Sequence, residues 1–163
     1  MHPSTRKTTA MIAFGALTGT TAGLGALASR PSGSAWFRAL DKPPFQPPDW
    51  VFGPVWSVLY GMIAASGYRT WRAPRSAHRS RALALWGIQL GLNGLWSPIF
   101  FGKKAPVAAL VDVSFLLGTT AGYVSAARKA DRTAAWLAAP YLGWVAFATV
   151  LNAEIVRRNR LLP

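Results

Sequence analysis

The chain has 163 residues, enough for one domain, and 52% of them are hydrophobic while only 14% are charged. This balance is unusual for a water-soluble globular protein and favours a membrane protein. The formal net charge of +13 suggests nucleic-acid binding at first sight. Nearly all Lys and Arg flank long apolar runs, however, where cations meet lipid headgroups, so we expect a lipid partner and no nucleic acid.

Five runs of the sequence are apolar enough to cross a bilayer. A spanning helix needs roughly 20 apolar residues, because it rises about 1.5 Å per residue through a hydrocarbon core about 30 Å thick. The expected spans cover residues 8–29, 50–69, 82–101, 105–127 and 133–154. We therefore predict an all-α membrane protein with one domain, residues 1–163, built as a bundle of five transmembrane helices.

The first run also has the outline of a signal peptide. Arg6 and Lys7 precede it, and it ends in Ala26-Leu27-Ala28, which has the form of a cleavage site. The apolar stretch is long for that role, so we expect it to remain as a span. Cleavage would leave four spans.

The loop at residues 30–49 is the only long connector. Two proline pairs, Pro43-Pro44 and Pro47-Pro48, flank Phe45 and Gln46 and restrict the chain to stiff conformations. Such a loop suits a lid over the mouth of a helix bundle, and the alternative is a rigid surface connector.

Helical periodicity gives several spans an inward face with aromatic and polar side chains. Amides are costly against lipid and belong toward the interior of a bundle. The four inward faces that we predict contain Trp56, Tyr60, Ile63 and Gly67; Gln89, Asn93, Trp96 and Phe100; Ala108, Asp112, Phe115, Thr119 and Tyr123; and Tyr141, Trp144, Ala148 and Asn152.

Three glycines lie opposite the amides on the third span. Gly87, Gly91 and Gly94 share this face, and small residues four apart allow another helix to approach closely. Gly87 and Gly91 therefore form either a homodimer interface or a packing face within the monomer.

Asp112 is the one ionisable side chain well inside a span. An intramembrane carboxylate is a candidate proton carrier or counter-ion. A Thr, Tyr or backbone partner would instead give it a structural role, which we favour.

The sequence lacks the groups of a conventional hydrolase or metalloenzyme. Without cysteine there is no disulfide or thiolate, and His2 and His78 lie outside every span. Neither paired carboxylates for general acid–base chemistry nor metal-ligand spacings occur. We expect no metal site and no required cofactor.

The tryptophans divide into two groups. Trp36, Trp50 and Trp71 lie at span ends, where an interfacial aromatic belt accounts for them. Trp56, Trp96 and Trp144 lie deeper, as either core filling or the walls of a site for a flat, largely apolar ligand.

Several motifs resemble one known family. Residues 36–61 read WFRALDKPPFQPPDWVFGPVWSVLYG, which is similar to the signature of the TspO/translocator protein family of tryptophan-rich sensory proteins. NGLWSPIFFG (93–102), ALVD (109–112) and PYLGWVAFATVLN (140–152) are similar to further family blocks in the same order. The resemblance covers residues 36–159, and the first span matches only in character.

The resemblance implies a five-helix bundle, often a homodimer, with a pocket that opens toward the first loop. Family members bind porphyrins such as protoporphyrin IX, many bind isoquinoline or benzodiazepine-type ligands, and some bind cholesterol. The pocket residues that it implies here are Trp56, Asn93, Trp144 and Ala148, with Trp50, Trp96, Leu151 and Pro47 beside them. The family is also associated with light-dependent porphyrin breakdown attributed to tryptophans at the positions of Trp56 and Trp144.

The cholesterol motif of animal members is incomplete here. It needs a Tyr between Leu or Val and Arg near the end of the last span, and residues 150–157 read VLNAEIVR. Sterol binding through that segment is therefore not expected.

Three functions follow from these observations. The first is a membrane-embedded binding or sensor protein for porphyrins and similar flat hydrophobic molecules, affecting tetrapyrrole levels. The alternative is a light-dependent porphyrin-degrading enzyme that uses Trp56 and Trp144. A transporter of porphyrin or sterol-like molecules, coupled to protons through Asp112, ranks third, because internal repeats and a charged pathway are missing.

Location and orientation are less defined. The absence of organelle-specific features favours a bacterial cell membrane. Ten Lys and Arg on the amino-terminal side face eight on the other, too small a difference to orient the protein.

Overall fold

The computed structural model describes residues 3–29 and 34–159, and the regular structure in these ranges is helical. The elements are α1 (Pro3–Ala28), α2 (Ala35–Ala39), α3 (Asp49–Arg72), α4 (Ala77–Ser97), the π-helical turn η2 (Pro98–Gly102), α5 (Pro106–Ala130) and α6 (Arg132–Arg158). His2 and the start of the predicted lid, residues 30–33, lie outside the described residues.

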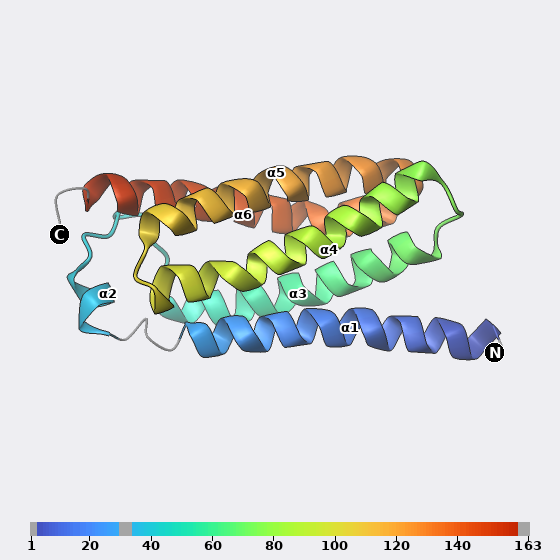
Figure 1. Ribbon diagram of the computed structural model, residues 1–163, viewed down its shortest axis with the longest axis horizontal. Coiled ribbons are helices and arrows are strands. Elements are labelled where there is room, and N and C mark those ends of the chain that lie inside the picture. The colour runs from blue at the N-terminus through green and yellow to red at the C-terminus, as the bar shows by residue number, and fades with distance from the viewer. Residues whose placement is uncertain (1–2, 30–33, 160–163) are drawn as a thin grey trace.

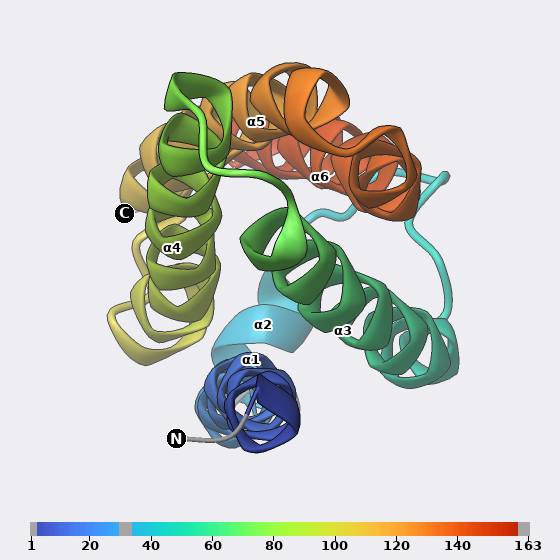
Figure 2. The ribbon, with the colours of Figure 1, turned by 90° about the vertical axis from the view of Figure 1, so that its right-hand side faces the viewer.

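The long helices lie side by side around a closed circuit (Figures 1 and 2). Helix α1 packs against α3 and α4, α3 packs against α6, and α5 fills the place between α6 and α4. Short α2, η2 and the end of α6 gather at one end of the molecule, and the start of α1 lies at the other (Figure 1).

Four of these helices are long and apolar enough to cross a membrane. They are α1 from Ser4, α3, α5 and α6. Helix α4 is not among them, because its first turns carry His78, Arg79 and Arg81 and its interior carries two amides. The prediction of an all-helical membrane architecture is thus confirmed, with four candidate spans where the sequence suggested five.

Polar side chains cap the starts of α4 and α6. Ser76 Oγ accepts a hydrogen bond from the backbone N–H of Arg79 at 3.1 Å, and an Asp131 oxygen accepts one from Ala134 N at 3.0 Å. Such caps satisfy amide groups that have no partner within the helix. Asp131 also pairs with Arg69 at 3.1 Å, which links the turn between α5 and α6 to α3.

Large apolar side chains face outward along the helices. On α1 these include Met11, Ile12, Leu17 and Leu24, while the only side chain of α1 classed as buried among the described residues is Thr18. In water such a surface would be an aggregation hazard, whereas hydrocarbon chains solvate it without cost.

The inward face of α5 differs from the predicted one. Asp112 and Tyr123 are buried as expected, but Phe115 is 66% exposed and Ala108 is also exposed. The buried face instead runs through Ala109, Asp112, Val113, Leu116, Thr120 and Tyr123. The prediction failed because it took an aromatic ring as a marker of the interior, although lipid accepts phenylalanine as readily as a protein core does.

A glycine allows α1, α3 and α4 to meet closely. Gly67 of α3 lies against the indole of Trp86 from α4, so close that a Cβ atom added to it would stand 2.5 Å from the ring and 2.8 Å from Phe14. The Trp86 indole N–H donates a hydrogen bond to the Ile63 carbonyl at 3.0 Å, and Phe14 packs edge-on at 4.8 Å. The indole therefore cannot retreat without losing a buried hydrogen bond.

We predict that Gly67→Ala destabilises the protein by about 1–3 kcal/mol, because overpacking forces a buried ring from its position. Gly61→Ala is the matched control, since an added Cβ there meets nothing within 4 Å. The measurement is the apparent melting temperature of the detergent-solubilised protein by circular dichroism. Equal melting temperatures for the two variants would contradict the assigned packing.

Candidate ligand-binding site

A cavity of about 720 Å³ lies at the α2 end of the molecule. Every α-helix contributes to its walls, together with η2, and the segment before α3 contributes Gln46. This volume falls within the range of roughly 300–1,000 Å³ found for small-molecule sites. Exposed residues of α1 and α3, among them Gly23, Ala26, Gly53 and Ser57, line one side, so the cavity reaches the surface between these helices.

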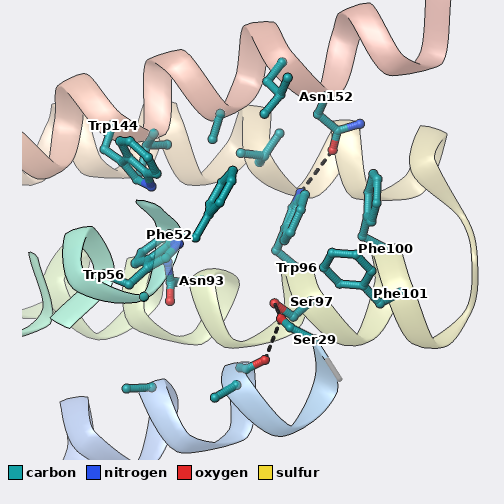
Figure 3. A pocket seen from close by; sticks show the side chains of 18 of the residues that line it. Ser29, Phe52, Trp56, Asn93, Trp96, Ser97, Phe100, Phe101, Trp144 and Asn152 are labelled. Carbon is teal, nitrogen blue, oxygen red and sulfur yellow. Dashed lines mark hydrogen bonds between the residues drawn. The ribbon is translucent and has the colours of Figure 1, made fainter. Parts of the chain in front are cut away.

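Three indole rings from three helices surround the cavity (Figure 3). Trp56 of α3 and Trp144 of α6 meet edge to face with ring centroids 6.3 Å apart, and Phe52 packs edge-on against Trp144 at 5.8 Å. Trp96 of α4 stacks on Phe100 at 4.8 Å. These rings present wide apolar faces suited to a flat ligand.

Asn93 ties three helices together beside these rings. Its Oδ1 accepts a hydrogen bond from the Tyr60 hydroxyl at 2.6 Å, and its Nδ2 donates to the Tyr141 hydroxyl at 3.1 Å. Tyr60 in turn stacks on Trp56 with centroids 5.2 Å apart. The amide thereby fixes the position of a cavity wall.

A second amide fixes Trp96. The indole N–H of Trp96 donates to Asn152 Oδ1 at 3.0 Å, and Asn152 Nδ2 donates to the Pro106 carbonyl at 3.0 Å. This chain joins α4, α6 and the start of α5. The indole is thus held in one orientation by an amide whose oxygen and nitrogen both have a partner.

The π-helical turn η2 shapes the end of the cavity. Pro98 lacks an N–H group and opens the turn, in which Lys103 N bonds Pro98 O at 2.9 Å. Phe100 and Phe101 of this turn pack edge-on against Phe37 of α2, at 6.3 and 5.3 Å. All three rings line the cavity.

The described part of the predicted lid, residues 34–49, is anchored at the same end. Asp41 N donates to Asn159 Oδ1 at 3.0 Å, Asn159 Nδ2 returns a bond to the Asp41 carbonyl at 2.9 Å, and Arg158 lies 3.5 Å from the Asp41 carboxylate. Gln46 reaches the cavity, and its buried Oε1 has no hydrogen-bond partner in the described structure. The segment therefore contributes side chains to the wall of the site.

The structure brings together most of the predicted binding residues. Six of the eight line the cavity: Trp56, Asn93, Trp96, Trp144, Ala148 and Leu151. The other two do not. Trp50 is 77% exposed at the start of α3, as suits an interfacial ring, and Pro47 is replaced on the cavity wall by its neighbour Gln46.

Sequence reasoning missed part of the wall. Phe52 lines the cavity one helical turn before Trp56, a spacing that would have placed it on the same face. Small residues of α1 also line the cavity, and they leave room that bulkier residues would fill. They are Gly23, Gly25 and Ala26.

Asp112 stands apart from the cavity lining. The residue is 8% exposed and its Oδ2 has no hydrogen-bond partner among the described residues. The Thr, Tyr or backbone partner expected for this oxygen is therefore not present in the described structure.

Gly87 and Gly91 lie on the outer face of α4. Both are exposed, and a Cβ added to either meets nothing within 4 Å. Gly94, predicted on the same face, instead approaches Thr21 of α1 at 3.4 Å from its added Cβ. Of these three glycines, only Gly94 therefore packs against another helix of the same chain.

These features define an integral membrane protein of packed helices with a ligand-sized aromatic cavity. The sequence profile of the TspO/MBR family matches residues 10–158, and the chain belongs to that family. It is 36% identical over 140 residues to the translocator protein of Bos taurus, covering 85% of this chain and 83% of the relative. It is 41% identical over 127 residues to the tryptophan-rich protein TspO of Archaeoglobus fulgidus, covering 76% and 80%. The tryptophan-rich sensory protein of Cereibacter sphaeroides is 37% identical over 124 residues, covering 76% and 77%.

Proposed function

We propose that the protein binds a flat, largely apolar ring system, with porphyrins such as protoporphyrin IX as the ligand class, and so senses or adjusts tetrapyrrole levels. The observation that carries this proposal is the convergence of Trp56, Trp96 and Trp144 on one cavity of about 720 Å³. Stacking on indole faces favours planar aromatic ligands over flexible chains. The relative from Cereibacter sphaeroides is named tryptophan-rich sensory protein, which agrees with a sensing role.

We predict that Trp144→Ala weakens protoporphyrin IX binding about tenfold or more, because it removes an aromatic wall of the cavity. Trp136→Ala is the matched control, since Trp136 lies on the same helix but is 76% exposed and outside the cavity. Binding is measured in the dark by saturable quenching of tryptophan fluorescence, with empty detergent micelles as blank. Equal affinities for the two variants would remove the cavity assignment, and no saturable quenching of the wild type would remove the ligand class.

A second candidate function is light-driven oxidation of the bound porphyrin with dioxygen as the oxidant. Trp56 touches three other oxidisable rings: Trp144 at 6.3 Å, Tyr60 at 5.2 Å and Tyr141 at 6.2 Å between centroids. Such a cluster can pass an electron to or from an excited ligand. Binding without chemistry remains our first proposal, since the cavity and its aromatic rings are sufficient for it.

This candidate predicts that Trp56→Phe keeps protoporphyrin affinity within about threefold, because a ring remains to stack, yet slows light-driven porphyrin loss to the rate in empty micelles. Porphyrin absorbance is followed under illumination and in the dark, with Trp136→Phe as control. If Trp56→Phe and the wild type lose porphyrin at one rate, Trp56 is not the electron relay.

We further propose that α4 with η2 forms a fifth span and that its outer face pairs two copies of the chain. Residues 82–102 carry no charge, and the exposed Gly87 and Gly91 leave α4 flat enough for close helix approach. Ile88 and Leu95, also exposed on α4, would flank the contact.

The double variant Gly87→Leu, Gly91→Leu should shift the detergent-solubilised protein from dimer to monomer, because the added side chains hold the helices apart. The control is Gly118→Leu on α5, an exposed glycine whose added Cβ also meets nothing within 4 Å. Mass measurement by size exclusion with light scattering distinguishes the states. A dimer that survives the double substitution places the interface elsewhere.

A further inference from the structure

The described walls of the cavity have almost no means of neutralising an acidic ligand. Among the described lining residues Asp49 is the only one with a formal charge, and Lys, Arg and His do not occur among them. Protoporphyrin-type tetrapyrroles carry two carboxylates on one edge of the ring. Burying a carboxylate without a cation or a full set of donors is strongly unfavourable, so that edge must remain where a cation can reach it.

The amides and hydroxyls of the lining carry no positive charge that could neutralise a carboxylate. One N–H of Asn93 Nδ2 already bonds Tyr141 and the Trp96 indole N–H bonds Asn152, and the Asp49 carboxylate would repel an acid. The carboxylate edge of the ligand is therefore expected at the lid end, with the apolar part of the ring between the indoles.

Lys42 is placed to meet that edge. It follows Asp41 in the lid, and its ammonium lies 4.5 Å from the ring centroid of Phe37, which lines the cavity. Within the described part of the chain Lys42 has no ion pair, whereas the neighbouring Asp41 carboxylate is taken by Arg158 and Glu154 by Arg157 and Arg158. A half-buried lysine with an uncommitted ammonium on a four-carbon stem can move from the Phe37 face to a carboxylate.

We propose that Lys42 is the specificity residue that selects acidic tetrapyrroles, by binding a ligand carboxylate at the lid end of the cavity while the indoles hold the ring. This inference rests on the proposed porphyrin-binding function. It goes further by assigning recognition of the acid group to the lid and recognition of the ring to the bundle. A neutral ligand of the same shape would then bind without help from Lys42.

The test compares protoporphyrin IX with its neutral dimethyl ester, both by dark fluorescence quenching of the full chain in uncharged detergent. We expect Lys42→Met to weaken binding of the free acid about three- to tenfold and to leave the ester unchanged, with Lys42→Arg restoring most of the free-acid affinity. Lys103→Met, an exposed lysine that follows η2, serves as the control and should change neither ligand. Added salt should weaken free-acid binding to the wild type more than to Lys42→Met.

The outcomes separate the two proposals. Equal weakening of acid and ester in Lys42→Met would show that Lys42 only positions Phe37, and unchanged binding of both would show that it has no role; either result overturns the assignment while porphyrin binding stands. A wild type that binds neither the acid nor the ester overturns the proposed function and this inference with it.

Discussion

The shape of the cavity depends on the two hydrogen bonds of Asn93. Between helices in lipid there is no hydrophobic driving force comparable to that in water, so close packing and interhelical polar contacts set the arrangement. Asn93 joins α4 to Tyr60 of α3 and to Tyr141 of α6, and both tyrosine rings contact Trp56. Each such bond contributes only about 0.6–2 kcal/mol in a membrane protein, yet together they specify which faces of three helices meet. A site built on this amide is held in shape before any ligand arrives.

The two ends of the bundle differ because the side chains between the helices differ in size. Away from the cavity, Ser66 donates to the Ala134 carbonyl at 2.7 Å and shares a hydrogen bond with Tyr123, which also meets Thr70 at 3.1 Å. Small hydroxyl side chains allow α3, α5 and α6 to approach closely there, and Gly67 allows α3 to approach α4 and α1. At the α2 end, wide rings hold the helices apart, and small residues of α1 leave the space beside these rings unfilled. The helices are therefore closely packed at the end that holds Ser66 and Tyr123, and the cavity lies at the α2 end.

The sequence determined the inward faces of α3, α4 and α6 because each carries an amide or a hydroxyl at helical spacing from a tryptophan, and lipid penalises exposed amides. The α5 face was mistaken because Phe115 carries no such penalty outside. Trp50 and Pro47 were assigned to the wall from family motifs, but whether a side chain at the lid or helix start turns inward depends on chain direction over a few residues. Periodicity within one helix does not contain that information, and it likewise could not reveal that α1 lines the cavity.

The part played by α1 bears on whether the first apolar run is a span or a removable leader. Ser29 at its end donates to Ser97 at 3.1 Å, Thr21 packs against Gly94 of α4, and Gly25 lies near the Tyr60 hydroxyl. A segment destined for removal has no reason to match the surface of helices it will leave. Without α1, moreover, Tyr60 of α3 and Gly94 and Ser97 of α4 would lose the neighbour that lies against them. The fit of α1 to these faces therefore favours its retention as the helix that closes the circuit around the cavity.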